Sequence, residues 1–172
     1  MKKRGDAGRP RGSAKDRALR LLSVRWRSRA ELARRLRQAG FEPEEVEAAL
    51  ESLELGGLID DARFAREMVR GMTGRRLAGD RGILASLAQK GVARDVADQA
   101  VTEAGDETER ALELARRRAP RMAGLEPEVA FRRLYGLLVR RGFGPRLAAE
   151  ACRTALQGPG SPPEGPLEPP EG

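Results

Sequence analysis

Residues 28–53 read SRAELARRLRQAGFEPEEVEAALESL, a pattern of two amphipathic helices joined by a short turn. Leu32 and Leu36 lie four residues apart, so they share one face of the first helix. From Val46 to Leu53 apolar residues again recur at spacings of three, four and seven, which predicts a second helix with a buried face. No convincing period-two alternation occurs along the chain, so no strand is expected.

Four residues predict where these two helices begin and end. Ser28 and Glu31 form the pattern of a capping box, which places a helix start near residue 29. Gly40 stands where a left-handed cap ends the helix, because glycine adopts positive φ without steric cost. Pro43 suits the first turn of the next helix, where its missing N–H is harmless.

The same pattern returns twice with a period of 51 residues, at Gly91-Val92 and at Gly142-Phe143 after Gly40-Phe41. Apolar character is kept at five aligned positions of the three copies. These positions are Leu32/Ile83/Leu134, Leu36/Leu87/Leu138, Val46/Ala97/Ala148, Ala49/Ala100/Ala151 and Leu50/Val101/Cys152. A fixed period of this size indicates tandem supersecondary units, so the predicted fold is all-α: three tandem three-helix repeats, similar to helix-turn-helix units, in an elongated curved array.

The repeats are expected to span residues 16–57, 58–105 and 106–157. Residues 1–15 are interpreted as a disordered basic arm, and residues 158–172, which hold six prolines and four glycines, as a disordered tail. Asp60 or Asp61 is expected to cap the first helix of the second repeat, and Asp106 that of the third. The expected helices are 16–25, 28–39 and 43–55, then 60–72, 79–90 and 93–103, then 106–119, 127–141 and 145–156.

The formal net charge of +7 comes almost entirely from arginine, with 29 Arg against 4 Lys. A guanidinium binds phosphates and carboxylates bidentately, so a polyanionic partner such as nucleic acid or a nucleoprotein is expected. The alternative is that these arginines are solvated surface charge. Residues 17–37 hold eight Arg and the single acid Glu31, whereas residues 42–61 hold eight acids and no base.

Composition excludes several classes of site. The chain has no His and one cysteine, Cys152, so zinc sites built on Cys and His, Ser-His-Asp catalysis and a disulfide framework are excluded. It also has no P-loop motif. We therefore expect no enzyme, no cofactor and no metal, and we interpret the carboxylate pair Asp60–Asp61 as a helix cap. No apolar run approaches the about 18 residues that cross a bilayer, and no signal peptide follows Met1, so a cytoplasmic protein without membrane contact is expected.

Basic residues define a candidate interface with DNA phosphates, which would bind without sequence choice. The candidate residues are Arg34, Arg35, Arg37, Arg63, Arg66, Arg70, Arg75, Arg76, Arg81, Lys90, Arg140 and Arg141. Arg63, Arg66 and Arg70 follow the 3, 4 spacing of one helix side. Major-groove reading by every repeat is not expected, because helix 43–55 carries five glutamates and no base.

The aromatic residues are interpreted as packing residues rather than as stacking platforms for single strands. Phe41 and Phe143 follow equivalent glycines, and Trp26 and Phe64 flank predicted helix starts. Cys152 aligns with Leu50 and Val101 and is expected to be buried. Residues with an expected structural role are Asp60, Asp61, Phe64, Gly40, Gly91 and Gly142.

The stretch GLIDDARFAR at residues 57–66 resembles the signature that opens the middle repeat of RecX proteins. It is followed at the fitting distance by Arg70, Gly79, Ile83, Leu87 and KGV at 90–92, and RGF at 141–143 resembles the closing motif of the third repeat. The resemblance covers about residues 16–157. Gly82 and Ser86 depart from it, because the family tends to have Arg and Glu there; Arg81 is a candidate substitute for the first.

The resemblance implies a non-enzymatic regulator of the RecA recombinase in DNA repair, recombination and the SOS response. Such proteins bind RecA–DNA filaments and generally limit filament growth, ATP hydrolysis, coprotease activity and strand exchange. The expected partners are a RecA-type recombinase, its nucleoprotein filament, and single- and double-stranded DNA, bound by a monomer. Two alternatives stay open: a DNA-binding transcriptional regulator that acts without a recombinase, and a protein–protein adaptor.

Overall fold

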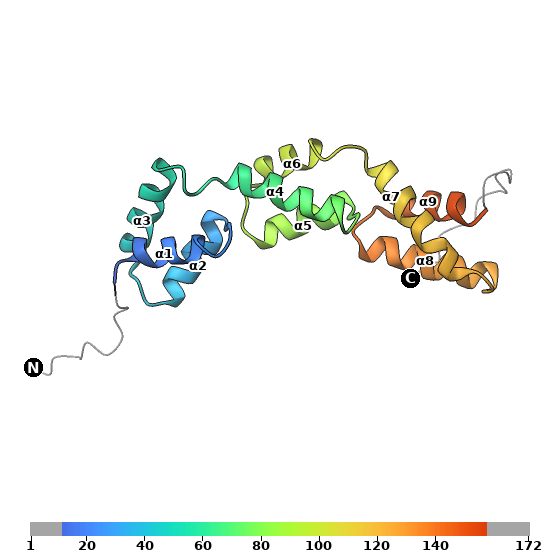
Figure 1. The fold of residues 1–172 in the computed structure, drawn as a ribbon, viewed down its shortest axis with the longest axis horizontal. Helices are drawn as coiled ribbons and strands as arrows, with labels where there is room; N and C mark the ends of the chain where they lie inside the picture. Colours follow the sequence, from blue (N-terminus) through green and yellow to red (C-terminus); the bar gives the residue numbers. More distant parts are fainter. Residues whose placement is uncertain (1–11, 158–172) are drawn as a thin grey trace, which may run out of the picture. The chain divides into compact units, whose positions relative to one another are not determined.

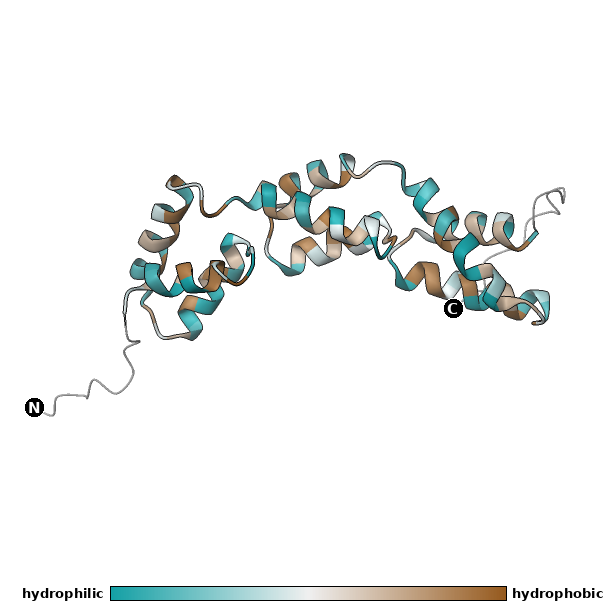
Figure 2. Cartoon of the chain, viewed as in Figure 1, coloured by the Kyte–Doolittle hydropathy of each residue, from teal (hydrophilic) through white to brown (hydrophobic). Residues whose placement is uncertain are grey.

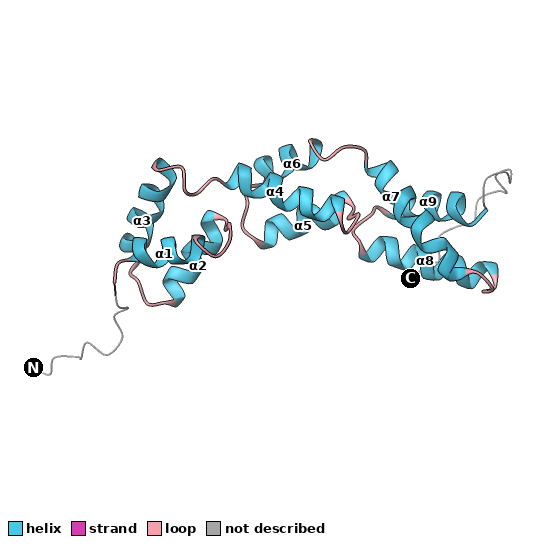
Figure 3. Cartoon of the chain, viewed as in Figure 1, coloured by secondary structure: helices cyan, strands magenta, loops and turns pink. Residues whose placement is uncertain are grey.

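The computed structural model describes residues 12–157, which form nine α-helices, one 3₁₀ helix and no strand (Figures 1 and 3). The helices are α1 (Ala14–Leu22), α2 (Arg29–Gln38), α3 (Pro43–Leu55), α4 (Asp61–Gly74), α5 (Asp80–Gln89), α6 (Arg94–Thr102), α7 (Glu107–Arg118), η1 (Ala119–Met122), α8 (Pro127–Arg140) and α9 (Pro145–Gln157). The prediction of an all-α chain of three three-helix repeats is confirmed. The elongated, curved form of the array stays a prediction. The tail at 158–172 and residues 1–11 of the expected arm lie outside the described residues.

Helix α1 begins earlier than the expected residue 16. Ser13 caps it by accepting a hydrogen bond from the backbone N–H of Asp16 at 3.0 Å, and the Asp16 side chain accepts from the N–H of Ser13 in return. This reciprocal capping box places Ala14 and Lys15 in the helix. The expected end of the basic arm at residue 15 is therefore wrong by two residues.

The three repeat-equivalent glycines end their helices as predicted. Gly40, Gly91 and Gly142 have φ of +90°, +74° and +88°. After each glycine the next residue donates its N–H to the carbonyl five positions earlier, as Phe143 does to Leu138 at 3.2 Å. This bond belongs to the Schellman motif, which requires a left-handed residue at the position of the glycine.

The chain divides into two compact units. The first runs to Met68 and takes in Ser86–Ala100, and the second comprises Val69–Ala85 and the chain from Val101 onward. Hydrophilic and hydrophobic residues alternate along the helices in Figure 2, as amphipathic helices require. No helix among residues 12–157 combines the length and the apolar character needed to cross a membrane.

Each unit has its own apolar core. The first core gathers residues of α1, α2 and α3 together with Phe41 and Ile59. The core of the third repeat joins α7, α8 and α9 with Leu77 and Phe143. Cys152 is fully buried in this core, and burial raises the pKa of its thiol to about 12. Its interpretation as a buried apolar residue is confirmed.

The first and second repeats meet inside the first unit. At this joint Ser28 Oγ donates a hydrogen bond to the carbonyl of Lys90 at 2.5 Å. The backbone N–H of Arg29, in the first turn of α2, donates to Asp61 Oδ1 at 2.8 Å. The start of α2 is thus capped from the next repeat, because the first N–H groups of a helix have no partner inside it.

The second and third repeats meet inside the second unit by an equivalent joint, shifted by the repeat period. Here the N–H of Gly79 donates to the carbonyl of Arg141 at 3.0 Å, and the N–H of Asp80 donates to Glu107 Oε1 at 2.8 Å. Burial and the neighbouring Glu107 raise the pKa of Asp80. The chain therefore uses one type of joint twice.

A buried arginine, Arg110 of α7, reinforces the second joint. It is 8% exposed and donates to the carbonyls of Ala104 and Gly105 at 3.0 and 2.8 Å. Its guanidinium also forms an ion pair with Asp80. These bonds satisfy the donors of a guanidinium that is shielded from water.

The second joint requires glycine at three positions. A Cβ on Gly79 would lie 2.5 Å from the carbonyl oxygen of Gly142, and a Cβ on Gly82 would lie 2.9 Å from that of Arg141. A Cβ on Gly142 would overlap the backbone of Gly82. Gly82, a departure from the expected family pattern, thus permits the close approach of α5 and the turn after α8.

Candidate nucleic-acid interface

Most of the predicted interface arginines are exposed on helices or on the turns after them. Arg34 and Arg37 lie on the exposed side of α2, and Arg63 is exposed in the first turn of α4. The other exposed members of the predicted set are Arg35, Arg70, Arg75, Arg76, Arg81 and Arg140. The guanidinium groups of Arg34, Arg37, Arg75, Arg76, Arg81 and Arg140 form no ion pair with any residue in the range 12–157.

Arg35, Lys90 and Arg141 of the predicted interface set bind other residues of the chain. Arg35 and Lys90 form ion pairs with Glu31, at 3.2 and 3.5 Å. Arg141 donates a hydrogen bond to the backbone carbonyl of Arg76. Lys90 and Arg141 are 51 residues apart and lie at the two equivalent joints, so the structure gives both of them a place in the joining of repeats.

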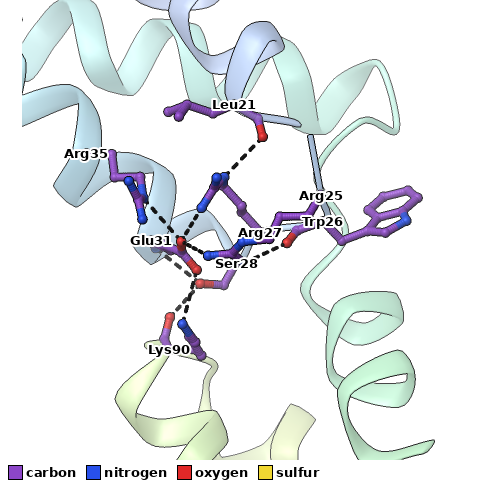
Figure 4. A network of polar contacts seen from close by, with 8 residues as sticks. All are labelled: Leu21, Arg25, Trp26, Arg27, Ser28, Glu31, Arg35 and Lys90. Carbon is purple, nitrogen blue, oxygen red and sulfur yellow. Dashed lines mark hydrogen bonds and ion pairs between the residues drawn. The ribbon is translucent and has the colours of Figure 1, made fainter. Parts of the chain in front are cut away.

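Glu31 is the centre of a buried charge network (Figure 4). Its side chain is 1% exposed, and Oε1 accepts hydrogen bonds from Arg25 Nη2 and Arg27 Nη1, each at 2.5 Å. Arg35 Nε reaches the same oxygen, and Lys90 Nζ of the second repeat lies 3.5 Å from Oε2. Oε2 itself accepts no hydrogen bond from the described residues.

The network sets the charge of Glu31. Burial by itself raises the pKa of this carboxyl, but the hydrogen bonds from Arg27 and Arg25 outweigh it and lower the pKa to about 2. The capping box expected at Ser28 and Glu31 forms only by half. Ser28 Oγ accepts the N–H of Glu31 at 3.1 Å, whereas the carboxylate turns to the cations instead of to the N–H of Ser28.

The two acidic candidates, Asp60 and Asp61, have different roles. Asp60 caps α4, since its Oδ1 accepts the N–H of Arg63 at 2.8 Å. Asp61 reaches back to α2 at the first joint, and burial raises the pKa of its carboxyl. The sequence did not decide which of the two aspartates caps α4. It gave no sign that Asp61 binds the backbone N–H of Arg29, because that contact joins residues 32 positions apart.

The acidic helix α3 uses part of its charge inside the first repeat. Arg29 of α2 forms ion pairs with Glu47 and with Glu54, the latter at 3.0 Å. Groove reading by helix 43–55 was not expected, and these ion pairs with Arg29 of the neighbouring helix do not alter the acidic character of α3. The start of α3 is capped by Glu42 and Glu45, with Pro43 in the first turn as predicted.

Trp26 lies on the surface, so its interpretation as a packing residue is wrong. The side chain is 41% exposed, and the guanidinium carbon of Arg63 lies 4.5 Å from the centroid of its ring. Phe41, Phe64 and Phe143 are buried as predicted. Arg25 and Arg27, on either side of Trp26, both reach Glu31, and the indole points away from that carboxylate (Figure 4).

Comparisons with known proteins assign the family. The family models of three successive RecX domains match the sequence of this chain. The first three-helix domain matches residues 14–53, the second 60–101 and the third 105–152. The chain belongs to the RecX family. The proteins named Regulatory protein RecX of Amycolatopsis mediterranei (strain U-32) and Mycobacterium avium (strain 104) are 36% and 38% identical to it, over 146 and 141 residues. The matches cover 84% and 80% of this chain and 83% and 82% of those relatives.

Two solved RecX structures have the same fold. The crystal structure of RecX from Lactobacillus salivarius matches with a TM-score of 0.73 at 23% identity, and covers 84% of this chain and 94% of that one. A second structure, of a regulatory protein RecX, gives a TM-score of 0.73 at 26% identity over 82% of this chain and 72% of its own. The family and the fold expected from the resemblance are therefore confirmed.

The RecX signature at residues 57–66 is mainly structural in its first half. Ile59 is buried in the first core, Asp60 caps α4 and Asp61 caps α2 across the joint. Phe64 is also buried. Arg63, which contacts Trp26, is the first basic member of the signature, and its side chain is exposed.

Proposed function

We propose that this chain binds nucleoprotein filaments of a RecA-type recombinase and limits ATP hydrolysis, coprotease activity and strand exchange by that recombinase. The observation that carries the proposal is the match of all three helical repeats to the three successive RecX domains. The chain would act as a non-enzymatic monomer in the cytoplasm. Its effect would come from occupying the filament, not from a reaction of its own.

The exposed arginines support a role in binding polyanions. Seven members of the predicted interface set, on all three repeats, have no carboxylate partner among residues 12–157: Arg34, Arg37, Arg63, Arg75, Arg76, Arg81 and Arg140. Guanidinium groups bind phosphates and carboxylates alike, so they suit both DNA and acidic protein surface. Contacts spread over several repeats add by multivalency when one chain bridges several recombinase subunits.

The acidic helix α3 disfavours the alternative of a sequence-reading transcriptional regulator. Its glutamates would be repelled by phosphates in a major groove. Phosphate contacts made by arginine instead give affinity without sequence choice and weaken steeply as salt rises. The proposed DNA contacts are therefore sequence-independent, with single- and double-stranded DNA both bound.

The proposal is tested by the single-strand-dependent ATPase of the cognate recombinase, measured with increasing amounts of this protein. We expect the rate to fall and to reach a plateau as filaments become saturated. Excess single-stranded DNA added in parallel separates an effect on the filament from simple competition for DNA. An ATPase rate that stays constant at saturating amounts contradicts the proposal.

Replacing Arg63, Arg66 and Arg70 of α4 together with Ala should weaken filament binding, because the three share one helix side. Each lost phosphate contact should reduce the slope of log affinity against log salt by about 1. Co-sedimentation with filaments at several salt concentrations measures both quantities. Helical content and melting temperature should stay close to those of the unchanged protein.

The matched control removes the same charge elsewhere. Arg94, Arg117 and Arg146 are exposed and each forms an ion pair with an acid on its own helix. Replacing these three with Ala should change filament binding little. Equal loss of binding in the two triple variants would show that only net charge matters and that α4 has no special place in the interface.

A further inference from the structure

Trp26 is the one aromatic side chain of this protein that is exposed. Three of the other five aromatic residues are buried, and Phe131 and Tyr135 are half-buried and stack on each other with ring centroids 5.9 Å apart. An exposed indole leaves a large apolar surface in water, which a folded protein normally avoids. The exposed part of this ring is available to a partner outside the chain.

The backbone that carries Trp26 is held on both sides. Arg25 donates hydrogen bonds to Glu31 and to the carbonyl of Trp26, the latter at 3.2 Å. Arg27 is 7% exposed and donates to Glu31 and to the carbonyl of Leu21 at 3.1 Å. A ligand that stacks on the indole thus pays little conformational entropy to order the segment that presents it.

Arg63 fixes the ring and remains able to bind a phosphate. Its guanidinium carbon lies 4.5 Å from the ring centroid, within the range of a cation–π contact. A stacked guanidinium keeps its N–H groups in its own plane, where they can donate to an oxygen. No carboxylate among the described residues pairs with this guanidinium, and Arg66 follows one turn later on α4.

We propose that Trp26 and Arg63 form a stacking site for one unpaired base of single-stranded DNA. The base would stack on the indole, and the adjoining phosphate would bind the N–H groups of Arg63. Duplex DNA would not use the site, because its bases are already stacked within the helix. The inference deepens the proposed function by naming the form of DNA that this site prefers, and it rests on that function.

A protein partner is the competing occupant. Val24 and Leu58, on the loops that lead to Trp26 and to α4, and Leu55, the last residue of α3, are also exposed. Apolar, tryptophan and arginine side chains together are frequent in protein interfaces. A base is favoured because the cation at the ring has no acidic partner in the described chain and the formal charge of the protein is +7.

The DNA-binding measurements use the full chain without recombinase, so their outcome does not depend on any effect on filaments. Trp26 is the only tryptophan, so its fluorescence reports on this site alone. Oligo(dT) should quench the fluorescence saturably, whereas a duplex of equal charge should quench it weakly. Binding of labelled oligo(dT) to Trp26→Leu should weaken by about 5-fold to 150-fold, the range for the loss of one stacked base. Trp26→Phe should recover most of the affinity.

A substitution at a neighbouring exposed residue is the control for the Trp26 variants. Val24→Ala removes a neighbouring exposed apolar side chain and should leave oligo(dT) binding unchanged. Equal affinity of Trp26→Leu and the unchanged protein for oligo(dT) overturns the inference, and so does an equal loss for oligo(dT) and duplex. Weaker capture of DNA-free recombinase by Trp26→Leu, with oligo(dT) binding intact, assigns the site to protein contact. An unaltered recombinase ATPase, with quenching still present, would reject the proposed function alone.

Discussion

Replacing Glu31 with Ala is expected to lower the free energy of unfolding by about 3–5 kcal/mol, the range for breaking a buried ion pair from one side. The change leaves the guanidinium of Arg27, which is 7% exposed, without its anion. It also leaves the positive charges of Arg25 and Arg35 near each other with no carboxylate between them. Urea unfolding followed by far-UV circular dichroism measures the loss. It should be visible as a lower midpoint with little change in slope.

An exposed ion pair provides the control for Glu31. Glu113 pairs with Arg117 on the surface of α7, with the two side chains 49% and 58% exposed. Its replacement by Ala should cost less than about 1 kcal/mol, because exposed pairs contribute little. Similar losses for the two variants would contradict the central role assigned to Glu31.

The same carboxylate predicts how stability depends on pH. The folded-state pKa of Glu31 is about 2, below its ordinary value of 4.5. Its contribution to stability is therefore complete above the ordinary pKa and is lost as the pH falls through 4.5 toward 2. Relative to Glu31→Gln, the unchanged protein should lose about 3 kcal/mol over this window. A constant difference between the two proteins from pH 6 to pH 2.5 would contradict the shift.

Gly142→Ala is expected to destabilise the second unit by about 3–5 kcal/mol, since it combines backbone strain with overpacking. The residue has φ of +88°, and its new Cβ would overlap the backbone of Gly82. Gly82 cannot move aside easily, because the atoms that the new Cβ would meet belong to its main chain. Thermal and urea unfolding measure the loss.

Three other glycines separate the two causes. Gly124 has φ of +81° and open space around a Cβ, so Gly124→Ala reports strain alone, about 1–2 kcal/mol. Gly79 has an ordinary φ but no room, so Gly79→Ala reports the clash with the 141–143 turn. Gly71, inside α4, has neither constraint, and Gly71→Ala should stabilise by about 0.5–1 kcal/mol. A cost at Gly142 no larger than at Gly124 would show that the joint tolerates a side chain there.

The helices and cores were predictable because they depend on local patterns. Leu32, Leu36 and their repeat equivalents follow helical spacing, and their burial requires no knowledge of distant contacts. The turn glycines were predictable for a similar reason, since a helix followed at once by another needs a left-handed residue. Repetition strengthened each of these inferences, because one pattern was present in three copies.

The candidate site was predictable only in part, because its decisive contacts join distant residues. Glu31 reaches Lys90, and Arg110 reaches Ala78. The signal for Glu31 was present in the sequence, since it is the only acid among eight arginines at residues 17–37, but its fit to a capping box suggested a local role. Nothing in the spacing of Trp26 distinguishes an exposed ring from a buried one.

The division into units has a consequence for dissecting the protein. The chain passes from one unit to the other between Met68 and Val69, between Ala85 and Ser86, and between Ala100 and Val101, and all three points lie inside helices α4, α5 and α6. Proteases cleave exposed loops far more readily than hydrogen-bonded helix. Limited digestion should therefore not release the two units as intact fragments, because a single cut between α4 and α5 or between α5 and α6 leaves residues of both units in each fragment.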